Sequence, residues 1–302
     1  MSKPPKLTRG VARDARRSAR SPLGDVLRSA LADDLLRMLL HEPGALRSLP
    51  EDVHQMRTAV RRLRSDLRFL GPAMLEERSR PLRVELKWLA GVLGEVRDLD
   101  VLEDRLRGAV VSLHLVAETD PLFEELDRRR GARRAALVEA ISGDRYAGLR
   151  RTAIAEARSP GLSDEADRPA GGMLVDRLSK DWRRLIEEVE SAPADAPIEA
   201  LHELRKRAKR TRYAAESAAG RLGDRAGKAA RRIGRRCKEF QEALGLVQDA
   251  AVAVFFIREV ADLLPDDGPA RSALDALIDH QHREADAALG RYAILRDRLA
   301  GA

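Results

Sequence analysis

The sequence repeats itself after about 150 residues, and this duplication constrains the fold more than any other feature. A run that starts at His54 aligns without a gap to a run that starts at His202, and basic residues recur at matching later positions. A second match follows in the same order, between residues 93–98 (LGEVRD) and residues 244–249 (LGLVQD). The offset between the copies is 148 for the first match and 151 for the second. Two matches in one order predict two units built on the same plan.

Composition and apolar spacing predict that both units are helical. Of the 302 residues, 35% are charged and 3% are aromatic, a balance that favours long helices over a sheet. Apolar residues recur at intervals of three and four from Val26 to Leu39, and this first helix is expected to end around Pro43–Gly44. Further helices are predicted over 50–70, 73–107, 122–142, 145–158, 171–190, 197–221, 223–262 and 267–300. The predicted fold is all-α, with two antiparallel helical bundles related by a pseudo-twofold axis.

Two polar stretches rich in Pro, Gly or Ser set the expected boundaries. Residues 1–22 lack a sustained apolar stripe, and we expect a flexible basic arm there. Residues 159–172 (SPGLSDEADRPAGG) are typical of a linker. One domain over 23–300 is therefore expected, made of repeats at 23–158 and 173–300.

Cysteine content and hydropathy exclude several classes of protein. The single cysteine, Cys237, allows no disulfide within the chain and no cysteine zinc site. The start of the chain lacks the apolar segment of a signal peptide, and the longest apolar run, Ala250 to Ile257, is too short to cross a membrane. We therefore expect a cytoplasmic protein with no membrane insertion.

Positive charge is concentrated in a few segments. Lys and Arg exceed Asp and Glu by 6 in residues 1–20, by 4 in residues 54–70 and by 10 in residues 201–240, whereas the rest of the chain carries a net charge of −13. A basic composition alone would scatter these residues. The segregation indicates a surface that meets a polyanion.

Each His-containing run places its basic residues along one helical face. At 100° per residue, five residues from His54 to Arg68 fall within an arc of about 80°, beside an apolar arc that faces the core. The second run follows the same plan. The candidate ligand-binding residues are His54, Arg57, Arg61, Arg62, Arg64 and Arg68 in the first run and His202, Arg205, Lys206, Lys209, Arg210 and Arg212 in the second. Like charges at this spacing repel, so either acidic helices or an anionic ligand must cover the stripes.

A second basic set lies on the next long helix of each half. Its members are Arg80, Arg83 and Lys87 in the first half and Lys228, Arg231, Arg235 and Lys238 in the second. Each set is expected to line a groove together with its stripe. The arginine side chain offers five donors in a rigid fork that matches a phosphate group, so such a groove suits phosphate chains.

The two histidines open their runs at equivalent positions. Each imidazole either donates to a phosphate oxygen or has a structural role near a helix start, and the sequence leaves both readings open. Neither His54 nor His202 has a second histidine or a carboxylate one turn later, so no metal ion is expected.

The LG segments contain carboxylates and glycines at matched positions. We interpret Asp98 and Asp249 as helix caps or ion-pair partners of a neighbouring basic helix rather than as a catalytic pair. Gly94 and Gly245 are expected to permit a close helix crossing.

The two HxxRxxx(K/R)(K/R)xR runs and the segment from Leu93 to Val101 resemble the CHAD family, the conserved histidine α-helical domain. The resemblance covers roughly residues 23–300. It implies two helical bundles whose basic helices line a central groove that binds inorganic polyphosphate, and a location on polyphosphate granules for some members. The second copy departs from the pattern, with Gln248 in place of Arg97 and Ala251 in place of Asp100. Many members are fused to a triphosphate tunnel domain that carries an ExExK strand, and without that motif we expect a standalone binding module.

The residues also permit two other functions. Nucleic-acid binding would use the same positive charge, but single-strand binders stack bases on aromatic side chains, and the ten aromatic residues are not interleaved with the stripes. A metal-dependent phosphohydrolase would need clustered carboxylates or histidines where this chain has cations. We therefore expect a non-catalytic polyphosphate-binding protein without a cofactor, with nucleic-acid binding as the alternative.

Overall fold

The computed structural model describes residues 21–193, 196–265 and 268–300. Within these ranges the chain forms nine α-helices and no β-strand, so the predicted all-α fold is confirmed. The helices are α2 (Leu23–Leu46), α3 (Pro50–Phe69), α4 (Glu76–Leu113), α5 (Asp120–Ser142), α6 (Asp144–Arg158), α7 (Ala170–Ser191), α8 (Ile198–Ala219), α9 (Asp224–Ala261) and α10 (Pro269–Ala300).

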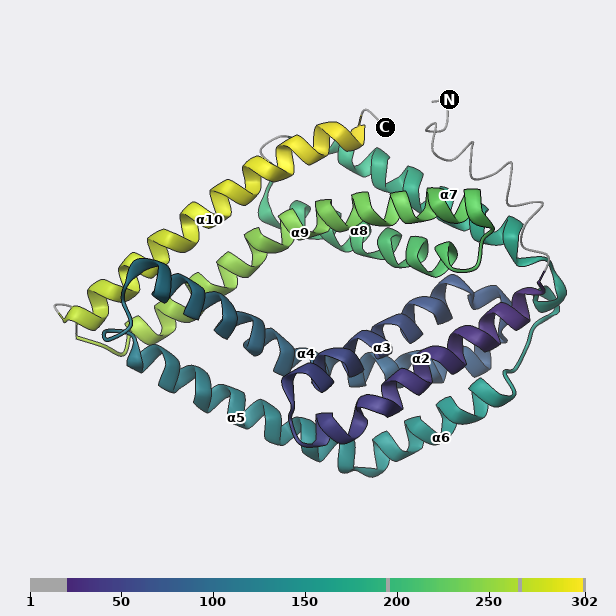
Figure 1. Cartoon of the computed structure of the whole chain (residues 1–302), viewed down its shortest axis with the longest axis horizontal. Coiled ribbons are helices and arrows are strands. Elements are labelled where there is room, and N and C mark those ends of the chain that lie inside the picture. Colours follow the sequence, from purple (N-terminus) through teal and green to yellow (C-terminus); the bar gives the residue numbers. More distant parts are fainter. Residues whose placement is uncertain (1–20, 194–195, 266–267, 301–302) are drawn as a thin grey trace.

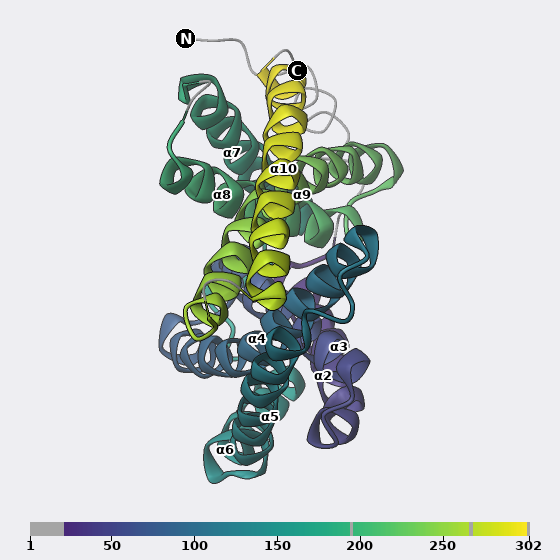
Figure 2. The ribbon, with the colours of Figure 1, turned by 90° about the vertical axis from the view of Figure 1, so that its left-hand side faces the viewer.

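The duplication reappears in the order of the helices. The His-containing runs lie on α3 and α8, and the LG segments lie on α4 and α9, which are both 38 residues long. In each half the helix with the His run packs against the long helix that follows it. Helices α2–α6 and α7–α10 form two halves around a central opening (Figure 1), and Figure 2 shows α4, α5, α9 and α10 gathered at the end that closes it. The pseudo-twofold axis stays a prediction.

Two helices of the first half, α2 and α4, extend beyond their predicted ends. The prediction that the first helix ends around Pro43–Gly44 is wrong, because α2 continues through both residues to Leu46. Gly44 is needed for the approach of α3, since a Cβ at this position would lie 2.0 Å from Asp52 Oδ2. The long helix α4 runs six residues past its predicted end and stops where His114 adopts a left-handed backbone conformation with φ of 57°.

The hydrophobic core is shared between the halves. The main core contains side chains from both, among them the fully buried Trp182 of α7 and Leu63 of α3. A second core lies at the closed end, where Leu106 of α4 and Leu126 of α5 belong to the same cluster as Phe256 of α9. Closure at this end therefore fixes α4 and α9 relative to each other.

The segment between the halves is held against the start of α2. Pro22 and Pro169 form an isolated antiparallel bridge, and the Leu23 amide donates to the Arg168 carbonyl oxygen at 2.9 Å. A short 3₁₀ helix (Asp164–Asp167) lies within the expected linker, and α7 begins before its end. Residues 1–20 of the expected basic arm lie outside the described residues. None of the helices in the described ranges contains a stretch that is both long and apolar enough to cross a membrane.

Candidate functional site

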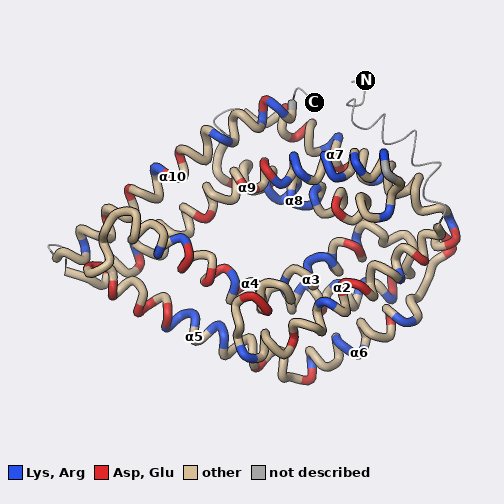
Figure 3. The backbone as a smooth tube through the Cα atoms, in the orientation of Figure 1, with Lys and Arg blue, Asp and Glu red and all other residues tan. Residues whose placement is uncertain are grey.

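A cavity of about 600 Å³ lies between α3, α4 and α8, and its lining is strongly cationic. We call it the groove. Ten basic side chains line it against one carboxylate, Glu76. The ten are Arg57, Arg61, Arg64 and Arg68 of α3, Arg80, Arg83 and Lys87 of α4, and Lys206, Lys209 and Arg210 of α8. In Figure 3 the basic stretches of α3 and α8 border the central opening, and side chains of both helices, far apart in the sequence, line the groove.

The structure does not bring every candidate residue into the groove. The predicted residues that do not line it are His54, Arg62, His202, Arg205, Arg212, Lys228, Arg231, Arg235 and Lys238. The first half thus supplies the groove with its stripe and its second basic set, as expected. The second half contributes one segment of α8 and none of the predicted α9 cations.

Most groove cations lack a counterion within the described part of the chain. Arg57 approaches Asp98 at 3.5 Å, Lys206 pairs with Glu203 at 2.7 Å, and Arg83 pairs with Glu76. The other carboxylates of the described ranges form no ion pair with Arg61, Arg64, Arg68, Arg80, Lys87, Lys209 or Arg210. Seven of the ten groove cations therefore have no ion-pair partner among the described residues.

Several groove cations have a lowered pKa, which shows that their charged forms are disfavoured at these positions. Burial, followed by the charges of Arg205, Arg57 and Arg61, lowers the pKa of Lys209 to about 8. Burial also lowers the pKa of Arg61 and of Arg64. An anion in the groove would favour the charged forms of these side chains. Relief of their mutual repulsion would then contribute to the free energy of binding.

Tyr213 of α8 is the one aromatic side chain that lines the groove. It is 8% exposed, and the guanidinium carbons of Arg61 and Arg212 each lie 5.0 Å from the centre of its ring. Cation–π contacts of this kind hold arginines from both halves at one point. The helical spacing does not reveal this contact, because Arg61 and Tyr213 lie 152 positions apart in the sequence.

The two histidines have different surroundings, and neither lines the groove. The Gln248 side-chain oxygen accepts from Arg205 Nη1 at 2.9 Å and lies 3.0 Å from His202 Nδ1. An amide oxygen has no hydrogen to donate, so His202 Nδ1 carries the hydrogen in this arrangement. His54 Nδ1 is buried with no hydrogen-bond partner, and burial, then the charge of Arg97, lowers its pKa. His202 thus has a structural contact that His54 lacks.

The glycines of the LG segments lie against arginines of the His-containing runs. A Cβ at Gly94 would lie 3.8 Å from Arg57 Nε, and a Cβ at Gly245 would lie 3.4 Å from Arg205 Nε. The expected close approach is therefore to a guanidinium, and a side chain larger than alanine would push that arginine aside. The two matched motifs are in direct contact in each half.

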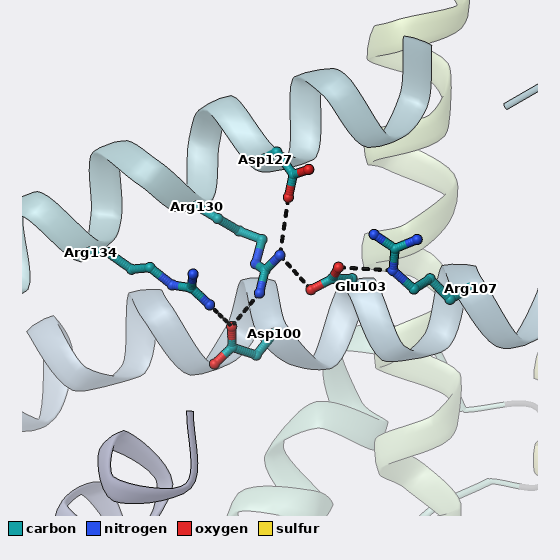
Figure 4. A network of polar contacts seen from close by, with 6 residues as sticks. All are labelled: Asp100, Glu103, Arg107, Asp127, Arg130 and Arg134. Carbon is teal, nitrogen blue, oxygen red and sulfur yellow. Dashed lines mark hydrogen bonds and ion pairs between the residues drawn. The ribbon is translucent and has the colours of Figure 1, made fainter. Parts of the chain in front are cut away.

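Asp100, the carboxylate missing from the second copy, has a structural role. Figure 4 shows its buried side chain between Arg130 and Arg134 of α5, at 3.3 Å and 3.4 Å. Arg130 also reaches Glu103 and Asp127 at 2.5 Å and 3.1 Å. This network joins α4 to α5 and lies outside the groove lining.

The structure corrects the placement of Arg62. It lines a second cavity of about 390 Å³, where its charge faces Asp34 of α2. Asp34 and Asp66 are each 5% exposed, and Asp66 pairs with Arg221 of the other half at 3.0 Å. Burial, then the charge of Asp66, raises the pKa of Asp34 to about 6. The helical position of Arg62, about 100° from Arg61, directs it to this side of α3, where the acidic Asp34 of α2 lies.

Within the described residues no three His, Cys, Asp or Glu side chains gather in a way that could hold a metal ion. Cys237 is buried, and burial raises the pKa of its thiol. The groove therefore offers donors for an anion and a single carboxylate, already paired.

Comparisons with known proteins identify a family and proteins of similar fold. A family model described as CHAD domain matches residues 29–258. Two uncharacterized proteins of Mycobacterium tuberculosis are each 30% identical over 250 residues, which is 77% of this chain and 45% of each relative. The chain thus spans less than half the length of the relatives it matches.

Among solved structures, PptA from Streptomyces chartreusis has a TM-score of 0.73 at 21% identity, covering 91% of this chain and 99% of that one. The CHAD domain from the plant Ricinus communis has a TM-score of 0.66 at 24% identity, covering 90% and 93%.

Proposed function

The chain belongs to the CHAD domain family, and from this premise we propose that it binds inorganic polyphosphate in the groove without cleaving it. The observation that carries the proposal is the lining of ten cations, most of them without a counterion among the described residues. A linear polyanion presents a charge at every repeat and can contact several of these side chains at once. Each contact releases a counterion, so affinity grows with the number of cations engaged.

Nucleic acid is the alternative ligand, and the aromatic residues argue against it. Binding of single strands relies on bases stacked on open aromatic faces. Tyr213, the aromatic side chain of the groove, is buried beneath Arg61 and Arg212. Competition of polyphosphate with single- and double-stranded DNA at one salt concentration tests the choice. We expect polyphosphate to displace DNA, and equal affinity for both would overturn the assignment.

The proposal includes no catalysis. Cleavage of a phosphoanhydride needs a metal ion or a positioned base. The carboxylate of the groove, Glu76, is exposed and paired with Arg83. We expect no phosphate release from polyphosphate, with or without Mg²⁺, above a protein-free control. The same binding would recruit the protein to cytoplasmic polyphosphate granules, which fluorescence microscopy of a tagged chain can test.

Glu76 is a built-in competitor of the ligand, which gives a specific prediction. Its carboxylate pairs with Arg83 at the groove, so an incoming phosphate must displace it. Glu76→Gln is expected to tighten polyphosphate binding by about three- to tenfold, as one favourable exposed pair no longer has to be broken. Titration with a fluorescent polyphosphate measures the effect. Glu77→Gln changes the same net charge at the next, exposed position outside the groove, and an equal gain there would show that only overall charge matters.

The acid–base state of Lys209 predicts a pH dependence of binding. With a pKa of about 8 in the empty groove, Lys209 is charged below this pH and neutral above it. Because the anion favours the charged form, affinity should be constant below about pH 7 and should fall by up to tenfold per pH unit above 8. Lys209→Arg should bind without this decline, because arginine stays protonated. A flat profile for the unmodified chain between pH 7 and 9.5 would contradict the prediction.

A further inference from the structure

The two repeats do not offer equivalent surfaces to a ligand. Each groove residue has a matched position in the other repeat, 148 residues later for α3 and 151 residues later for α4. If both repeats bound the ligand, matched positions would carry similar charge. Their side chains would also be similarly free of ion-pair and hydrogen-bond partners within the chain. Five of the seven groove cations of α3 and α4 are matched by a cation, and Arg61 is matched by Lys209, which also lines the groove. The other matched positions differ in charge or in the partners of their side chains.

On α3 and α8 the matched arginines differ in their partners. Arg64 has no ion-pair partner among the described residues, whereas its match Arg212 pairs with Glu216 at 2.9 Å and donates to Gln241 at 3.2 Å. Arg68 is matched by Glu216 itself, so a groove cation is replaced by a carboxylate. A cation that already has a counterion must break that pair before it can bind phosphate, so it contributes less.

A third matched pair on these helices follows the same rule. Arg57 lines the groove and has one weak contact, with the exposed Asp98 at 3.5 Å. Its match Arg205 does not line the groove, because it donates to Gln248 and packs on Gly245. Gln248 itself is held by His202, so this arginine is fixed within its own repeat.

On α4 and α9, too, most groove cations are unpaired within the described part of the chain, whereas their matches are paired or replaced. Arg80 is exposed without a partner in the described ranges, whereas its match Arg231 donates to the Ala219 carbonyl at the end of α8. Arg83 is matched by Gly234, and Lys87 is matched by Lys238, which lies 3.6 Å from Glu242. Arg235 is the exception, since it is an exposed cation matched to Val84.

We propose that polyphosphate is bound on one side of the molecule only, by α3, α4 and the Lys206–Arg210 segment of α8. Apart from Lys209, which lines the groove, and the exposed Arg235, the cations of the matched surface of α8 and α9 are replaced or already paired within the chain, so the rest of that surface takes no direct part. This inference rests on the proposed function, and it adds which of the two repeated surfaces is the binding surface.

Two matched double variants test the inference, because each removes two positive charges from equivalent positions. Arg80→Gln with Lys87→Gln alters the groove, and Arg231→Gln with Lys238→Gln alters the matched surface. Affinity for one preparation of long-chain polyphosphate is measured by fluorescence anisotropy at several salt concentrations. The first double variant should bind roughly tenfold more weakly or worse, and its log–log salt slope should be shallower by about 1.4. The second should stay within about twofold of the unmodified chain.

The single variants Lys87→Gln and Lys238→Gln guard against effects of folding, since both lysines are exposed. Equal losses in the two double variants, or in the two single variants, would show that the ligand uses both surfaces, which overturns the inference while the proposed function stands. No loss in the Arg80 and Lys87 variant would overturn the inference and the groove together. Absence of binding by the unmodified chain would overturn the proposed function itself.

Discussion

Reversing the charge of Arg64 and Arg68 is expected to weaken polyphosphate binding about 100-fold or more and to leave the helices intact. Both side chains line the groove one turn apart on α3, and neither has a counterion among the described residues. Each loses a charge-assisted contact of about 1.5–3 kcal/mol and introduces repulsion toward phosphate. Because the wild-type stripe is itself repulsive, two glutamates there should not destabilise α3.

The matched control reverses two arginines on the outside of the molecule. Arg283 and Arg291 of α10 are exposed and do not line the groove, so Arg283→Glu with Arg291→Glu changes net charge by the same amount. Affinities are measured by titration, and helix content by circular dichroism. A comparable loss in the control would mean that binding depends on net charge, and retention of affinity in the Arg64 and Arg68 variant would refute the groove.

Removing Arg221 is expected to cause the largest loss of stability, about 3–5 kcal/mol for Arg221→Leu. Its guanidinium pairs with Asp66 at 3.0 Å across the two halves, and the Asp66 side chain is 7% exposed. Without Arg221, the buried carboxylates of Asp66 and Asp34 lie near each other without this counterion. Removing one partner of a buried ion pair leaves the other charge uncompensated, which costs about 3–5 kcal/mol of stability. Chemical denaturation at pH 7.5 measures the change.

The pH dependence of this variant identifies the cause. The pKa of Asp34 is raised to about 6, chiefly by burial, and losing Arg221 removes a positive charge that lowers the pKa of this carboxyl group. A carboxyl whose pKa is raised in the folded state binds more protons there, so stability is greater at low pH and declines as pH rises. The loss in Arg221→Leu should therefore be smaller at pH 5, and adding Asp66→Asn should recover part of it at pH 7.5. A loss independent of pH would point to packing instead.

The helix content and the first-half stripe could be predicted from the sequence because both depend on local periodicity. His54 to Arg68 share a face whatever surrounds them, and the apolar arc beside them fixes that face against the core. The same periodicity places Arg62 outside that face, so the prediction of Arg62 as a groove residue went beyond the helical spacing. What the spacing along α3 does not reveal is that Asp34 of α2 faces Arg62.

The second-half cations show a signal that local reasoning could have used. Glu216 and Glu242 each follow a predicted site cation, Arg212 and Lys238, by four residues, a spacing at which helical ion pairs form. Local spacing could not predict the partners of Arg205 and Arg231, because Gln248 and the Ala219 carbonyl belong to other helices. The repeat predicted equal roles for both halves, whereas these contacts distinguish them.

The salt dependence of polyphosphate affinity tests the central claim most directly, because counterion release counts the cations that meet phosphate. If about six groove cations engage the chain, the logarithm of the association constant should fall linearly with the logarithm of salt concentration, with a slope near −4. Saturable binding with such a slope is the result we predict for the unmodified chain. A slope shallower than about −1, or no saturable binding at low salt, would contradict a groove that binds polyphosphate through its cations.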